Sequence, residues 1–86
     1  MTNPNDASAI ALDALIWILE DSLRADRFLG LTGLSPDGLR ARIAEPAVQA
    51  AALTFLEAHE PDLVACAAAR GMDPATLVAA ARELGA

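Results

Sequence analysis

The 86-residue sequence predicts an all-α fold, a compact bundle of five to six short helices. Residues with high helix propensity fill long stretches such as 47–59 and 63–70, whereas Val, Thr and aromatic residues are sparse and never alternate with polar ones. Two phrases, Gly-Leu-Ser-Pro at 33–36 and Gly-Met-Asp-Pro at 71–74, each combine the end of one helix with the start of the next. These observations indicate helices joined by tight turns.

Each of the two phrases has a physical role for every residue. The Gly can adopt the left-handed conformation that ends a helix, and the apolar residue after it can pack back against that helix. Ser35 or Asp73 can then accept hydrogen bonds from the free N–H groups of the next helix. The Pro occupies the first helical position, where no intrahelical donor is lost.

Six helices follow from the capping residues and prolines. We expect them at residues 7–20, 23–31, 36–44, 46–59, 61–70 and 74–84. Asp6 caps the first and either Asp21 or Ser22 the second, and a Pro opens each of the other four. The fourth must end near His59, because Pro61 disfavours helical geometry at the residue before it.

The domain organisation is simple. Residues 1–5 are expected to form a flexible tail and residues 6–86 a single helical domain. Residues 7–45 align with 45–83 without a gap, and this alignment places Trp17 on Phe55. The identities are few for such an Ala-rich chain, but the matched turns favour two pseudo-repeated three-helix units.

Composition and charge argue against nucleic acids and membranes as binding partners. The net charge is −6, and all six basic residues are Arg, so phosphate backbones and anionic membrane surfaces would repel the chain. The longest apolar run, residues 14–19, is too short to span a bilayer, and no basic residue opens a signal peptide. We therefore expect a cytoplasmic protein with no nucleic-acid or membrane partner. Cys66, the only cysteine, sits among small apolar residues and is expected to be buried.

The first helix is unusually apolar around its circumference. Asp6, Asp13 and Glu20 are spaced seven residues apart and form one narrow polar stripe. We interpret this stripe as the side of the helix that faces solvent. Ile16 and Trp17 flank that stripe, where a simple surface helix would carry polar residues. Either this helix is central and wrapped by the others, or Ile16 and Trp17 form an interface with a partner chain, since Trp is enriched in binding hot spots.

A modest basic island lies in the middle of the chain. It is either a solvated face or a site for a small anionic ligand beside the start of the helix at 36–44. Its four basic residues are Arg24, Arg27, Arg40 and Arg42.

No catalytic set or metal site is assembled in the sequence. His59 falls at the end of a helix, where a cationic side chain interacts favourably with the last backbone carbonyls, so a structural role accounts for this residue. With one Cys and one His the chain lacks the usual ligands of a zinc site, and the three Ser residues are explained by helix capping. We therefore expect no enzyme, no cofactor and no metal.

The residues that lead into the turn at 33–36 resemble those of a known family. The run Arg-Phe-Leu-Gly-Leu-Thr-Gly-Leu-Ser-Pro at 27–36, followed by Leu-Thr-Phe-Leu at 53–56 and the turn at 71–74, is similar to the bacterial family of domain of unknown function 3572. The resemblance covers nearly the whole chain after residue 5. It implies a small helical protein and supplies no activity, cofactor or catalytic residue.

The leading hypothesis is a non-enzymatic helical module that acts through protein contact, as a homodimer or as an adaptor for a larger partner. The alternative is a small anionic-ligand binder that uses the four arginines of the basic island.

Overall fold

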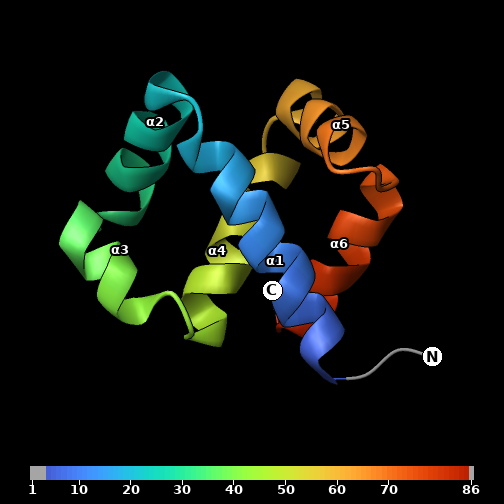
Figure 1. The fold of residues 1–86 in the computed structure, drawn as a ribbon, viewed down its shortest axis with the longest axis horizontal. Coiled ribbons are helices and arrows are strands. Elements are labelled where there is room, and N and C mark those ends of the chain that lie inside the picture. Colours follow the sequence, from blue (N-terminus) through green and yellow to red (C-terminus); the bar gives the residue numbers. More distant parts are fainter. Residues whose placement is uncertain (1–3, 86) are drawn as a thin grey trace.

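The computed structural model describes residues 4–85, and the side chains of residues 7–85, as an all-α bundle without strands. All six expected helices are present (Figure 1). They are α1 (Pro4–Leu19), α2 (Ser22–Thr32), α3 (Pro36–Arg42), α4 (Pro46–Glu57), α5 (Glu60–Ala69) and α6 (Pro74–Glu83).

The turn between α2 and α3 forms as the sequence predicts. Gly33 is left-handed, with φ of 74°, and its N–H donates to the carbonyl of Leu29 at 2.9 Å. The Ser35 hydroxyl accepts from the Gly38 N–H at 2.9 Å and so caps α3. Leu34 packs against the core, which completes the expected arrangement.

The turn between α5 and α6 repeats the backbone geometry but not the side-chain cap. Gly71 is left-handed, with φ of 66°, and the Met72 N–H donates to the Ala67 carbonyl at 2.8 Å. Asp73 stands at the N-cap of α6, but its side chain makes no capping hydrogen bond, so that part of the expectation is wrong.

The helix boundaries lie within three residues of the expected ones, and three capping positions are now assigned. α1 begins at Pro4, so Asp6 lies within the helix rather than at its N-cap; of the expected tail, residues 1–3 lie outside the described residues. Asp21, not Ser22, caps α2, because its carboxylate accepts from the Arg24 N–H at 3.1 Å. His59 was expected to end the fourth helix but occupies the N-cap of α5.

α1 and α4 form the centre of the molecule. They cross each other, with α2 and α3 on one side and α5 and α6 on the other (Figure 1). Ala14 on α1 and Ala52 on α4 are fully buried, and such small side chains allow two helices to pack closely. This arrangement agrees with the expected central helix. Among residues 4–85 no single helix is long and apolar enough to cross a membrane, and the pair α5 and α6 meets that test only jointly, across a bend of 102°.

The two halves of the chain bury equivalent positions. Pairs of residues 38 apart are both buried along α1 and α4 and again in the later helices. They are Ala14 and Ala52, Leu15 and Leu53, Trp17 and Phe55, Ile18 and Leu56, Phe28 and Cys66, and Leu39 and Leu77. The structure therefore has the pattern expected of two pseudo-repeated three-helix units.

Gln49 is the buried polar side chain in this core. It is only 3% exposed. Its Nε2 donates to the carbonyl of Ile43 at 3.1 Å and so ties α4 to the end of α3. The hydrogen bond compensates for the burial of the amide, which would otherwise be costly.

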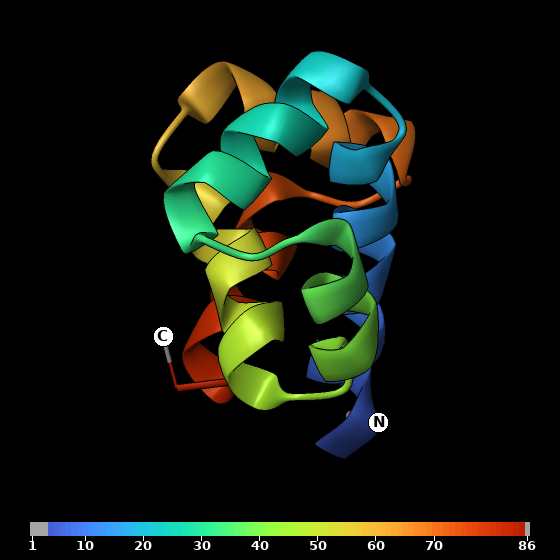
Figure 2. The same ribbon diagram turned by 90° about the vertical axis from the view of Figure 1, so that its left-hand side faces the viewer.

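The third helices of the two halves pack differently. α6 has ten residues and packs against α1, α4 and α5, whereas α3 has seven and makes few contacts with the other helices. Figure 2 views the molecule from the side of α2 and α3. The half that contains α2 and α3 is therefore less completely closed than the other half.

The close packing of α1 and α4 yields a stability prediction. Ala14→Leu adds three heavy atoms at a fully buried position, so we expect the free energy of unfolding to fall by about 1–3 kcal/mol. Ala9→Leu is the matched control, because Ala9 is exposed on the same helix. Chemical denaturation monitored by circular dichroism measures both variants, and equal stability of the two would contradict the assigned role of Ala14.

Candidate functional site

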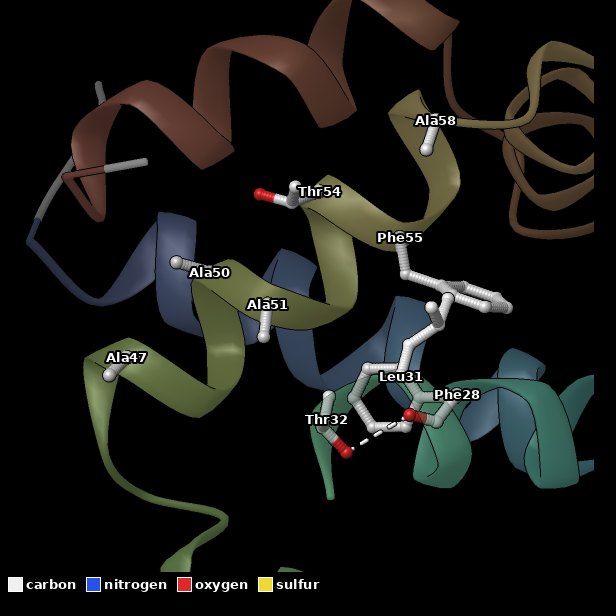
Figure 3. A pocket seen from close by; sticks show the side chains of 9 residues that line it. All are labelled: Phe28, Leu31, Thr32, Ala47, Ala50, Ala51, Thr54, Phe55 and Ala58. Carbon is white, nitrogen blue, oxygen red and sulfur yellow. Dashed lines mark hydrogen bonds between the residues drawn. The ribbon is translucent and has the colours of Figure 1, made fainter. Parts of the chain in front are cut away.

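An apolar groove lies between α2 and α4 and has a volume of about 420 Å³. Figure 3 shows mostly small side chains along α4, with Phe55 of α4 reaching toward Phe28 and Leu31 of α2. The lining residues are Phe28, Leu31 and Thr32 from α2 and Ala47, Ala50, Ala51, Thr54, Phe55 and Ala58 from α4 and its end.

No residue that lines this groove carries a charge. The Thr32 hydroxyl donates to the Phe28 carbonyl at 3.0 Å, so its polarity is satisfied within α2 (Figure 3). Phe28 and Phe55 meet edge to face, with ring centres 5.5 Å apart, and form the floor of the groove. Leu31 stands at the edge with 76% of its surface exposed. A large apolar side chain therefore projects beside an uncharged hollow.

A second groove adjoins the first around Leu31. It has a volume of about 310 Å³ and shares Leu31, Thr32, Ala47 and Ala51 with the first groove. Arg42 is the one charged residue that lines it. We call the surface formed by these two grooves and Leu31 the α2–α4 face. No acidic residue lines it.

A third groove lies on the other side of α2, against α1 and α3. Its volume is about 410 Å³, and its charged lining residues are Asp26 and Arg40. Apolar lining comes from Leu19, Leu29, Leu39 and Ile43, among others. All three grooves belong to the half of the molecule that α3 leaves partly open.

The structure separates the two residues of the expected interface on α1. Trp17 is only 8% exposed, because the Arg24 guanidinium stacks over its ring at 3.6 Å and donates to its carbonyl at 2.6 Å. Of the two alternatives for this helix, the burial of Trp17 under Arg24 of α2 therefore favours the central helix. Ile16 is 52% exposed and remains a candidate.

The four arginines of the basic island are not gathered at one site. Arg24 is held over Trp17, and the other three each pair with a carboxylate. These pairs are Arg27 with Asp62, Arg40 with Asp37 and Arg42 with Glu45. Arg40 lines the third groove and Arg42 the second, so the expected anion site is divided between separate places.

Arg70 was not singled out from the sequence, yet it joins α5 to the polar stripe of α1. Its guanidinium lies 3.2 Å from the Asp13 carboxylate and 3.2 Å from that of Glu20. The stripe is therefore partly neutralised rather than simply solvated. Its partner lies fifty or more residues away, so no local pattern indicates the pairing.

His59 pairs with Asp62, an acid three residues further along the chain, which we did not single out from the sequence although side chains at this spacing can meet. Its Nδ1 lies 3.0 Å from the Asp62 carboxylate, which also accepts from Arg27. This cluster connects α2 with the start of α5. Among the described residues, no group of three or more His, Cys, Asp or Glu side chains could hold a metal ion.

Cys66 is buried, as expected, and its surroundings are apolar. Burial raises the pKa of the Cys66 thiol to about 11, and the positive charge of Arg70 offsets this only in part. The thiol is therefore protonated near neutral pH and is a poor nucleophile.

The fold and its grooves define a small all-α bundle with a partly open half and an α2–α4 face whose lining contains no acid. A family model described as "Protein of unknown function (DUF3572)" matches residues 4–86, and the chain belongs to this family. Searches of curated proteins and of solved structures returned no match.

The raised pKa of Cys66 predicts an alkaline loss of stability. The unfolded thiol titrates near 9.0 and the folded thiol near 11, so the folded state keeps its proton while the unfolded state loses it. This contribution to the free energy of unfolding is complete below pH 9 and is lost as the pH rises through 11. At pH 11 the free energy of unfolding is about 2 kcal/mol lower than below pH 9. No Lys or Tyr side chain obscures this range.

The control is Cys66→Ala, which removes the only side chain assigned to this transition. Urea denaturation from pH 8 to 11 should give a free energy of unfolding that falls for the native sequence and stays nearly level for the variant. An equal decline in both proteins would rule out Cys66 as the cause.

Proposed function

We propose that this protein is a non-enzymatic helical interaction module that self-associates, with the α2–α4 face as the contact between two copies. The observation that carries the proposal is the uncharged groove of about 420 Å³ with Leu31 projecting beside it, 76% exposed. An exposed apolar side chain next to an apolar hollow is typical of an interaction site.

A second copy is the occupant that this face fits best. A two-fold dimer places the same patch on both sides of the contact, so the patch must complement itself. The α2–α4 face contains both a projection, Leu31, and hollows on either side of it. Leu31 of each copy can then fill the groove of the other.

The distribution of charge favours the same contact. Two copies that each carry a net charge of −6 repel each other wherever their acids meet. The lining of the α2–α4 face contains no acid, and its one base, Arg42, is paired with Glu45 next to it, so the lining itself brings no unpaired acid into the contact. The small side chains Ala47, Ala50 and Ala51 also let another helix approach α4 closely.

The remaining side chains support contact rather than catalysis. Cys66 is buried with a raised pKa, and His59 is held against Asp62. The arginines that an anionic ligand would need lie apart, and each already contacts Trp17 or a carboxylate of the same chain. No observation therefore favours the alternative of an anion-binding site. A bacterial cytoplasmic setting, with neither nucleic acid nor membrane as partner, completes the proposal. The acidic composition supports the exclusion of those two partners.

Sedimentation equilibrium over a concentration series tests self-association. Leu31→Glu places a charge at the centre of the contact, so we expect its dimer dissociation constant to be at least about tenfold higher than that of the native sequence. Val64→Glu is the matched control, because Val64 is also exposed, at 49%, but lies on α5. It should leave the dimer constant almost unchanged.

Two results would reject the proposal. One is a native protein that stays monomeric at high micromolar concentration. The other is a dimer that Leu31→Glu leaves as stable as Val64→Glu does.

A further inference from the structure

α3 has fewer anchors than α6, its equivalent in the other half of the molecule. Its seven residues bury one side chain, Leu39, whereas α6 buries Leu77, Ala80 and Ala81. Isolated helices this short are marginal in water, and Gly38 within α3 lowers its helix propensity further. α3 therefore depends on contacts with the rest of the molecule for its stability, and it makes few of them.

A charged residue accounts for the weaker packing of α3. Arg42 stands 38 residues before Ala80, which is only 2% exposed where α6 meets the core. An Arg at such a buried position would lose the hydration of its charge, and the Arg42 side chain instead stays 48% exposed and pairs with Glu45. The other ion pair of α3 joins Arg40 to Asp37. Both pairs join residues three apart, so neither ties α3 to another helix.

Open space lies on both sides of α3, which Figure 1 shows at the outer edge of the molecule. The third groove, of about 410 Å³, lies between α3 and the helices α1 and α2, and the second groove reaches the end of α3 at Arg42. Two contacts hold α3 in place across this space. They are the burial of Leu39 and the hydrogen bond from Gln49 to the carbonyl of Ile43, just after α3. Detachment of α3 therefore gives up only a small part of the core.

We propose that α3 opens as a unit while the other five helices stay folded, and that self-association through the α2–α4 face holds it closed. Leu34, just before α3, and Arg42, at its end, both line the second groove, which is part of that face. Opening of α3 removes this wall, so only the closed form presents the complete contact. The second part of the inference rests on the proposed dimer, whereas the first part does not.

The opening of α3 and the self-association of the chain are linked. A second copy that binds only the closed form lowers the population of the open form by mass action. Conversely, a change that favours the open form weakens self-association, because a smaller fraction of the chain is competent to bind. α3 is in this way a control on how readily the α2–α4 face assembles.

Hydrogen–deuterium exchange of the backbone amides, measured by mass spectrometry on the full chain, tests the opening in dilute samples. After correction for intrinsic rates, we expect the amides of α3 to exchange at least about tenfold faster than those of α6. Low concentrations of urea should hardly change the rate in α3, because its opening exposes little surface. They should speed exchange in α1, α4 and α6, which we expect to open only when the whole chain unfolds.

Leu77→Val and Leu39→Val are matched variants at equivalent buried positions of α6 and α3. Leu77→Val weakens the part of the core that stays folded when α3 opens. We therefore expect protection in α1, α4 and α6 to fall about fivefold while protection in α3 is unchanged. Leu39→Val should speed exchange in α3 by a similar factor. If Leu77→Val speeds α3 and α6 equally, α3 opens only with the whole fold and the inference is overturned.

A concentration series tests the link to self-association. In the native sequence we expect exchange in α3 to slow at least about fivefold from dilute to concentrated samples, and Leu31→Glu should show a smaller change over the same range. Fast exchange in α3 that does not depend on concentration, in a protein that sediments as a dimer, would reject the link but not the dimer. A protein that sediments as a monomer would reject the proposed dimer and the link together, and the dilute exchange rates then decide whether α3 opens by itself.

Discussion

The close packing of α1 across α4 is the contact on which the rest of the structure depends. Ala14 and Ala52 are buried there, and the larger side chains around them make up the core. α6 packs against both central helices and closes one half, whereas α3 closes the other only in part. The three grooves lie in that second half, so the open surface is a consequence of how the core is built.

Local features of the fold could be predicted from the sequence, because they involve neighbouring residues. The turn at Gly33 and the Ser35 cap depend on chemistry within a few positions, and both form as expected. Contacts between distant residues could not be predicted in the same way. The environment of Trp17 stayed open because Arg24 reaches over from the next helix to cover it, and the pairing of Arg70 with the polar stripe spans fifty or more residues.

The same distinction applies to the candidate sites. Ile16 was found from its position on the helix, and the structure leaves it exposed. Leu31 was not singled out from the sequence; it lies in the last turn of α2, where it is 76% exposed. The arginines are close together along the chain, but in the folded protein each has its own partner. Three of them form ion pairs with carboxylates of the same chain. The apolar α2–α4 face, whose lining contains no acid, remains open at the surface.

The central claim is that the α2–α4 face joins two copies of the chain. Nuclear magnetic resonance spectra of the backbone amides, recorded while the protein is diluted, test it most directly because they locate the contact. We predict concentration-dependent shifts at Leu31, Thr32 and the α4 residues Ala47 and Ala51, with α5 and α6 unaffected. Spectra that do not change on dilution, or shifts confined to α5 and α6, would contradict the account.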